Sequence, residues 1–365
     1  MSTLEAVIVD EIRHHGPISI ARFMDLALGH PSLGYYARHD PLGASGDFIT
    51  APEVSQVFGE LLGLWLAQAW MQLGSPSPCL LVELGPGRGT LMADLIRATT
   101  TVPGFRESTR LHLVETSARL RAVQQERLSQ TTATWHETLD EVPSGPMLLV
   151  ANEFFDALPI HQLVATEQGW FERTVDFDGK SLLFGTATEA SDLAGSLPEA
   201  GTYLGRIAEV SPMRNRMARQ IGERISAHGG VALLVDYGAS AEVTGDTLQA
   251  VRSHAPCSAL STPGDADLSS HVEFQALAAA ARDGGAAVYG PVPQGPFLRA
   301  MGIDVRVARL LERATPDQRR QLRAALFRLT DGTTMGELFK VLVLADPKAP
   351  PPPGFSDPNV VPEAS

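Results

Sequence analysis

Cysteine is scarce in this sequence, and that scarcity excludes a disulfide framework. The 365 residues include only Cys79 and Cys257. No CxxC pair occurs, and no set of cysteines and histidines has the spacing of a metal site. His254 lies three residues before Cys257, but one such pair does not make a site. We therefore predict a reduced, cytosolic chain without a structural metal.

Long apolar runs are also missing, which excludes a membrane-spanning helix. The first residues, MSTLEAVIVDEIRHHG, place acids inside a short apolar run. They resemble neither a secretory signal peptide nor an arginine-rich, acid-poor transit peptide. We expect a cytoplasmic, bacterial protein that does not insert into membranes.

Positive charge is in short supply. The chain has 29 Lys and Arg against 42 Asp and Glu, a formal net charge of -13. Such a surface argues against nucleic-acid binding; it either favours basic partners or serves solubility alone. With 44% hydrophobic and 19% charged residues, the composition is that of a globular chain with one large domain or two.

Strands and helices alternate from residue 79 onward, and this alternation predicts an α/β fold. Short apolar segments alternate with stretches of helical periodicity, which is typical of a doubly wound parallel sheet covered by helices on both faces. Period-two patterning around 163–185 predicts an inserted antiparallel hairpin or meander. We expect strands at 79–84, 110–115, 133–136, 146–153, 231–238, 286–292 and 337–347.

A glycine-rich turn follows the first of these strands in LVELGPGRGTL, residues 81–91. Gly85, Gly87 and Gly89 allow close approach of a ligand to the backbone, and the next helix offers free N–H groups. The spacing is not the G-x-G-x-x-G of dinucleotide sites. The acid Glu83 suits the cationic aminoacyl end of S-adenosylmethionine better than a pyrophosphate. This turn therefore predicts S-adenosylmethionine as the cofactor.

Glu115 ends the second strand, where a carboxylate can accept hydrogen bonds from both ribose hydroxyls. The alternative is a surface acid that caps the next helix, a role for which Ser117 would compete. A seventh strand after a long connection from the sixth fits the methyltransferase version of the sheet. In that version the last strand inserts antiparallel beside the sixth.

The segment VANEFFDALPIHQ follows the fourth strand, at the edge where ligands bind in open α/β sheets. A guanidinium, with a pKa above ~12, is a cation that paired carboxylates can hold bidentately. We interpret Glu153 and Asp156 as that pair, and Asn152 as an orienting amide. The alternative is that Asp156 caps a turn while the two phenylalanines fill the core.

Two further places carry candidate substrate or lid residues. Asp47 and Glu53 lie in SGDFITAPEVSQ, which could cover the cofactor. The alternative is a helix start at which Thr50 is the cap and Glu53 completes a capping box. Asp236, at the end of the fifth strand, is expected to reach the edge of the crevice.

These motifs together resemble the MidA-like family of class I S-adenosylmethionine-dependent methyltransferases, whose mitochondrial branch assists assembly of respiratory complex I. The matching stretches span nearly the whole chain except the tail. They are GYYARHDPLGASGDFITAPEVSQVFGELLGLW, LVELGPGRGTLMADLIRA, LHLVETS, ANEFFDALPIHQ, EVSP, GGVALLVDYG and MGELFKVLVL.

The resemblance implies a seven-stranded Rossmann-like methyltransferase sheet that modifies an arginine guanidinium to symmetric dimethylarginine. It implies a core subunit of NADH:quinone oxidoreductase as the protein substrate. It implies cofactor contacts by Glu83, Gly85, Pro86, Gly87, Arg88, Gly89 and Glu115. Two alternatives remain open: a small-molecule methyltransferase on the same fold, and an assembly chaperone with little turnover.

The expected organisation has three parts. Residues 1–75 form an N-terminal helical or lid segment. Residues 76–346 form the methyltransferase domain, with an insert at about 160–210. Residues 347–365 are too rich in proline to fold and are expected to be disordered.

Overall fold

The computed structural model describes residues 3–38, 50–239 and 245–356. The chain divides into two compact units, each built from pieces that are far apart in the sequence. Unit 1 contains Met1–Phe48, Asp156–Asn215 and Ala241–Glu273. Unit 2 contains Ile49–Phe155, Arg216–Ser240 and Phe274–Ser365. The part of the chain that is described contains no helix with both the length and the apolar character needed to cross a membrane.

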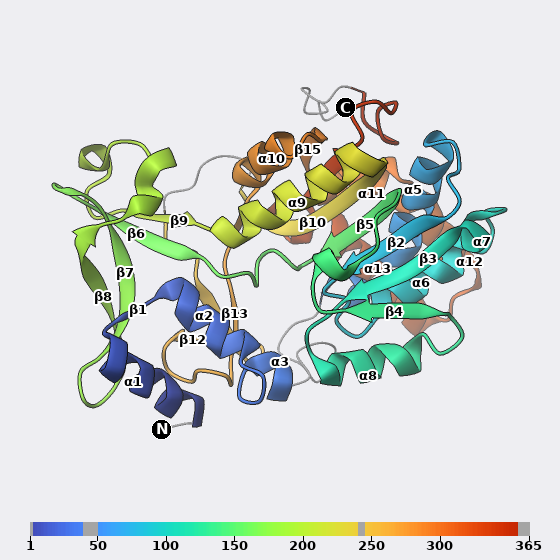
Figure 1. Ribbon diagram of the computed structural model, residues 1–365. Helices are drawn as coiled ribbons and strands as arrows, with labels where there is room; N and C mark the ends of the chain where they lie inside the picture. Colours follow the sequence, from blue (N-terminus) through green and yellow to red (C-terminus); the bar gives the residue numbers. More distant parts are fainter. Residues whose placement is uncertain (1–2, 39–49, 240–244, 357–365) are drawn as a thin grey trace. The chain divides into compact units, whose positions relative to one another are not determined.

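Unit 2 is an α/β unit built on one mixed sheet (Figure 1). The strand order is β15-β16-β10-β5-β2-β3-β4. Strands β10, β5, β2, β3 and β4 run parallel, and β16 is antiparallel to both β10 and β15. The bounds are β2 (Cys79–Leu84), β3 (Thr109–Val114), β4 (Ala133–His136), β5 (Met147–Asn152), β10 (Gly230–Ala239), β15 (Ala287–Pro293) and β16 (Phe339–Ala345). All the expected strands are present, and the final strand has the expected antiparallel pairing.

Helices cover both faces of this sheet, since every residue of β2, β5 and β16 is buried. One face packs against α5, where Phe58 and Trp65 join strand residues such as Val150 in a single apolar core. The helices are α4 (Ala51–Val54), α5 (Gln56–Gln72), α6 (Thr90–Thr99), α7 (Phe105–Ser108), α8 (Ala118–Arg127), α9 (Pro212–His228), α10 (Phe274–Asp283), α11 (Gln294–Ala300), α12 (Ile303–Arg313), α13 (Pro316–Thr330) and α14 (Met335–Leu338), with a 3₁₀ turn at Leu139–Glu141.

The long helix α5 begins at Gln56, directly after the short helix α4. Ser55 has extended backbone angles, and its side chain accepts a hydrogen bond from Val57 N. Ser55 is therefore an N-cap that separates α5 from the short helix α4.

The proline-rich segment after β16, expected to be disordered, makes specific contacts with unit 2 within residues 347–356. Trp65 Nε1 donates to Pro353 O at 2.8 Å. The Phe355 ring is 8% exposed and lies against Tyr289 and Phe297. One buried aromatic side chain anchors the segment, and proline leaves few backbone N–H groups to satisfy. Residues 357–365 lie outside the described residues.

Unit 1 combines helices with two antiparallel sheets and has its own apolar core, which includes Ile8, Phe23, Met24 and Tyr35. The larger sheet has the order β1-β7-β6-β9, with β8 on β7, and the smaller has the order β12-β11-β13. The bounds are α1 (Thr3–His15), β1 (Ile18–Ser19), α2 (Ile20–Gly29), α3 (Tyr35–Arg38), β6 (His161–Thr166), β7 (Gly169–Phe177), β8 (Leu182–Ala190), β9 (Ile207–Val210), β11 (Gln249–Arg252), β12 (Ala255–Cys257), β13 (Asp267–Ser269) and β14 (Val272–Glu273), with 3₁₀ turns at Asp192–Ser196 and Ala200–Tyr203.

The compact units differ from the segments expected from the sequence. Residues 49–75, expected with the N-terminal segment, belong to unit 2 because α5 packs on α6 and the sheet. The meander expected at 163–185 is present as β6, β7 and β8. Its sheet also recruits β1 and β9, and unit 1 further includes residues 241–273.

Candidate cofactor and catalytic site

The glycine-rich turn joins β2 to α6 and has left-handed backbone angles at each of its glycines. The φ angles are 60° at Gly85, 53° at Gly87 and 75° at Gly89. A Cβ atom at Gly85 would lie 2.8 Å from Phe154 Cδ2. Gly89 is the N-cap of α6 and supplies no side chain to it, so the helix end presents backbone N–H groups. The glycines are therefore required by conformation and, at Gly85, by space.

Glu83 lies at the end of β2 and is only 2% exposed. Among the described residues, its Oε2 atom has no hydrogen-bond partner. Burial raises the pKa of the Glu83 carboxyl to about 8, and the nearby Glu115 carboxylate adds to the increase. A buried acid with an unsatisfied oxygen beside a second acid favours the binding of a cationic or hydrogen-donating ligand.

Glu115 follows β3 and is buried, which is contrary to the alternative that it is a surface acid. Its Oε1 accepts a hydrogen bond from Ser117 N at 2.8 Å, and its Oε2 accepts one from Gln124 Nε2 at 3.3 Å. Burial raises the pKa of Glu115, while these two hydrogen bonds lower it. Ser117 itself caps α8 by accepting from Leu120 N.

Gln124 was not identified from the sequence, although one signal was available. It lies four residues after Leu120 and four before Leu128, both of which were expected to face inward. A polar residue on that apolar stripe is unusual, and Gln124 is completely buried. Its Nε2 also donates to Gly87 O at 2.8 Å, so one amide connects the glycine turn to Glu115.

Asn152 and Glu153 lie together where β5 ends, as expected. Glu153 has a φ of 50°, which is uncommon for a residue other than glycine and is concentrated at functional sites. Its Oε1 accepts from Ala51 N at 2.9 Å and from Asn152 Nδ2 at 3.1 Å. In the described part of the chain, the buried Asn152 Oδ1 has no partner. Since β5 and β2 are neighbours with Ala151 opposite Leu84, this pair lies beside the glycine turn.

Asp156 falls in unit 1, whereas Asn152 and Glu153 fall in unit 2. Its backbone carbonyl accepts from Ser270 N at 3.1 Å and from Arg214 Nη2 at 2.9 Å. We therefore build the candidate site from residues of unit 2.

A helix does start here, with Thr50 as its N-cap and Glu53 in its first turn, but Glu53 does not complete a capping box. Thr50 is the N-cap of α4, but its side chain makes no capping hydrogen bond. Glu53 Oε1 instead accepts from Thr90 Oγ1 at 2.5 Å, and Thr90 is the first residue of α6. Glu53 thus contacts the helix that follows the glycine turn. Asp47 lies outside the described residues.

Asp236, on β10, has a buried side chain that accepts hydrogen bonds from backbone N–H groups. It is 1% exposed, and its Oδ2 accepts from Phe154 N at 3.2 Å and Phe155 N at 2.9 Å. Its Oδ1 accepts from Tyr237 N at 2.9 Å. Asp236 therefore fixes the turn that contains Glu153.

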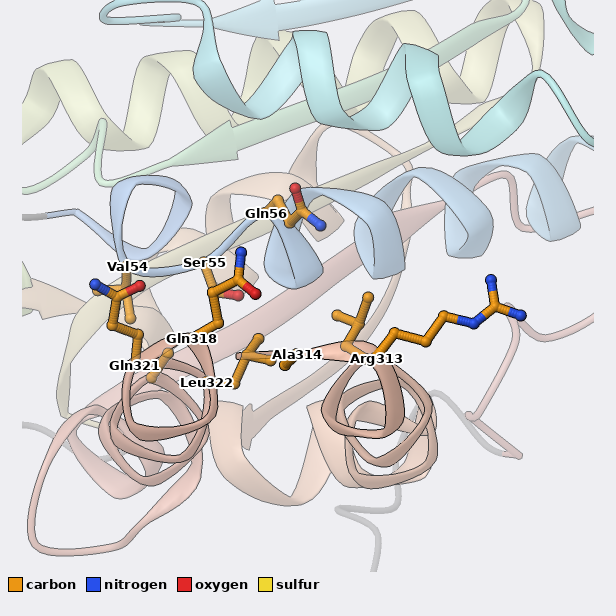
Figure 2. Close-up of a pocket in the computed structure, with 10 residues that line it drawn as sticks. Val54, Ser55, Gln56, Arg313, Ala314, Gln318, Gln321 and Leu322 are labelled. Atoms are coloured by element: carbon orange, nitrogen blue, oxygen red, sulfur yellow. The ribbon is translucent and has the colours of Figure 1, made fainter. Parts of the chain in front are cut away.

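A separate pocket of about 390 Å³ lies between the start of α5 and helices α12 and α13 (Figure 2). None of the predicted site residues lines it. Its polar lining consists mainly of glutamine amides, and Arg313 is its one charged lining residue. Its lining residues are Val54, Ser55, Gln56, Leu310, Arg313, Ala314, Gln318, Gln321, Leu322 and Ala325. The pocket therefore differs in place and in chemistry from the site around the glycine turn.

Comparisons with known proteins agree on one family. The family profile of S-adenosyl-L-methionine-dependent methyltransferases matches residues 61–292. The chain is 40% identical to "Protein arginine methyltransferase NDUFAF7, mitochondrial" of Danio rerio, over 89% of this chain and 82% of the relative. It is 36% identical to the Homo sapiens protein of that name, over 92% of this chain and 81% of the relative.

A solved structure is also similar over most of both chains. It is a COG1565 superfamily member from Burkholderia thailandensis bound to S-adenosyl-homocysteine. The TM-score is 0.79 at 28% identity, covering 94% of this chain and 91% of the other. The glycine turn, the buried acids and these similarities lead to one conclusion: the chain belongs to this family of S-adenosyl-L-methionine-dependent methyltransferases.

Proposed function

We propose that this methyltransferase modifies a guanidinium nitrogen of arginine in a protein substrate. The observation that carries the proposal is the Asn152–Glu153 pair, held in a strained turn beside the glycine loop. Two relatives, at 40% and 36% identity, are named protein arginine methyltransferases. A carboxylate and an amide oxygen are the acceptors that a planar, five-donor guanidinium requires.

The residues around the glycine turn fit the cofactor. The unpartnered oxygen of Glu83 suits the cationic aminoacyl end, and Glu115 suits the two ribose hydroxyls. The turn backbone supplies the remaining contacts through Gly85, Pro86, Gly87, Arg88 and Gly89. We further propose that the sheet of unit 2 is the seven-stranded, doubly wound sheet of class I methyltransferases.

The chemistry assigned to this chain is positioning and proton acceptance. When bound, S-adenosylmethionine supplies an electrophilic methyl group on its sulfonium. Glu153 holds the guanidinium, and Asn152 Oδ1 accepts one of its N–H groups, so that one nitrogen is directed at the methyl carbon. The bound cofactor would supply the methyl group and keep the electron pair of its S–C bond, and Glu153 would accept the proton that the methylated nitrogen loses. Asp156 as a further catalytic residue stays a prediction.

The substrate candidate is a core subunit of NADH:quinone oxidoreductase, with symmetric dimethylarginine as the product. This candidate comes from the family resemblance. The small-molecule and chaperone alternatives make different predictions about where label appears. A cytoplasmic location also stays a prediction. We propose that unit 2 is the methyltransferase domain.

Radiolabel transfer tests the proposal directly. The purified protein is incubated with methyl-labelled S-adenosylmethionine and lysate from a strain that lacks the gene. We expect label in one protein band, recovered after hydrolysis as methylated arginine, and no label with Glu153→Gln. Label confined to small molecules would contradict a protein substrate. Cofactor binding without any labelled product would support the chaperone alternative.

A further inference from the structure

The carboxylate of Glu115 is held from two sides by donors of this chain. Ser117 N donates to Oε1 and Gln124 Nε2 donates to Oε2, at 2.8 and 3.3 Å. The backbone of Thr116 also donates to this carboxylate. The two oxygens of a carboxylate have about four lone-pair positions together, so acceptor capacity remains for a ligand hydroxyl.

The orientation of the Gln124 amide is fixed by Trp135. The indole Nε1 donates to Gln124 Oε1 at 2.8 Å. An indole N–H can only donate, so the amide atom that faces it is the oxygen. The amide nitrogen must then face Gly87 O and Glu115, and both of its N–H groups have an acceptor. The completely buried side chain therefore has one favourable orientation.

We propose that Gln124 is a positioning residue that makes the cofactor site selective for an intact ribose diol. This inference rests on the proposed ribose role of Glu115. Without the Gln124 amide, the Glu115 carboxylate loses its donor on Oε2 and is held only by the backbone of Thr116 and Ser117, and Gly87 O loses its partner. The Gln124 hydrogen bond also lowers the pKa of Glu115 against the effect of burial, which favours the ionised acceptor.

Calorimetry on the full-length chain tests this selectivity with S-adenosylhomocysteine and its 2′-deoxy and 3′-deoxy forms. We expect the wild type to bind each deoxy form about tenfold or more weakly than the parent compound. In Gln124→Met, which keeps the length of the side chain but has no amide, the preference falls to within about threefold. Gln125→Met, at the exposed neighbouring position of α8, is the matched control and keeps the wild-type ratio.

The ratio of the affinities for the parent compound and its deoxy forms separates positioning from a general structural role. A damaged site loses affinity for all three ligands alike. Trp135→Phe removes only the donor that orients the amide, and we expect it to give an intermediate preference for the parent compound over the deoxy forms. It is the deciding variant if Gln124→Met does not fold. A wild-type ratio in both variants, together with loss of that ratio in Glu115→Gln, overturns this inference alone. A wild type without any preference for the diol overturns the ribose role of Glu115 and this inference with it.

Discussion

At the residue scale, the two buried acids of the cofactor site have different environments and different consequences. Glu115 has hydrogen-bond donors on both oxygens, whereas Glu83 has an unpartnered oxygen among the described residues. Ionisation of the buried Glu83 carboxyl therefore has a free-energy cost that depends on the ligand. In the ligand-free protein, no ligand offsets this cost.

The first prediction concerns the pH dependence of stability without cofactor. The folded-state pKa of Glu83 is about 8, above its ordinary 4.5, so the folded state binds the proton more tightly. The stability that the folded state gains from binding this proton is fully present below pH 4.5 and is lost as the pH rises toward 8. We expect Glu83→Gln to be more stable than the wild type at pH 9, by about 2–5 kcal/mol, and to lose this advantage at pH 4. Urea unfolding at several pH values measures the difference.

The control for Glu83→Gln is Glu107→Gln, which changes an exposed glutamate in the same unit. We expect Glu107→Gln to leave the difference in the free energy of unfolding between pH 9 and pH 4 as it is in the wild type. If the free energy of unfolding of Glu83→Gln equals that of the wild type across this pH range, Glu83 is not a buried acid whose ionisation destabilises the folded state.

The second prediction separates chemistry from cofactor binding at Glu153. Glu153→Gln keeps the shape of the side chain and removes the proton acceptor. We expect kcat to fall about 100-fold or more, while the affinity for S-adenosylhomocysteine stays within about threefold. Radiolabel transfer and calorimetry give the two values. Wild-type turnover in this variant would remove Glu153 from the catalytic site.

At the scale of elements, the strands were predictable and several helices were not. Continuous apolar segments such as 79–84 and 147–152 identify buried parallel strands, since no other short element is apolar on both faces. Helices α11 and α12 were not predicted. The strands at 249–257 are too short to show the alternation of polar and apolar residues that identifies a strand. Proline content did not indicate the contacts of residues 347–356, which depend on the Phe355 ring against Tyr289.

The third prediction concerns the turn between β2 and α6. Gly87→Val places a β-branched side chain at a φ of 53°, in the backbone that would approach the cofactor. We expect loss of S-adenosylhomocysteine binding, at least about 100-fold, in a protein that remains folded. Gly179→Val is the matched control: its φ is 94° and no atom lies within 4 Å of its added Cβ. Equal affinity in Gly87→Val and Gly179→Val would refute the assignment of the turn.

The fourth prediction concerns the C-terminal segment that packs on unit 2. Phe355→Ala removes a buried ring that lies against Tyr289 and Phe297, and we expect it to lower the free energy of unfolding by about 2–4 kcal/mol. Phe327→Ala, at a ring that is 54% exposed, is the control and costs less than about 1 kcal/mol. Chemical denaturation compares the two. Equal losses would mean that residues 347–356 do not stabilise the unit.

At the scale of the whole molecule, the two compact units have separate apolar cores. All the site residues that the structure brings together belong to unit 2, and the sequence predicted most of them from their positions at strand ends. It could not predict Gln124, or that Asp236 faces backbone groups, because both depend on contacts between distant segments.

The fifth prediction follows from the separate cores. We expect two calorimetric unfolding transitions, and we expect S-adenosylhomocysteine to raise the midpoint of only one of them, because it binds unit 2. The shifted transition is the one that Phe355→Ala lowers. A single transition that shifts as a whole would show that the units unfold together.

The position of β16 has a consequence for how the protein is made. This strand lies between β10 and β15 and pairs with both, yet its residues, Phe339–Ala345, come after every proposed site residue in the sequence. During synthesis, every proposed site residue has left the ribosome while the edges of β10 and β15 are still unpaired. A premature stop codon shortly before Phe339 thus leaves the site sequence intact but produces a chain that is prone to aggregate.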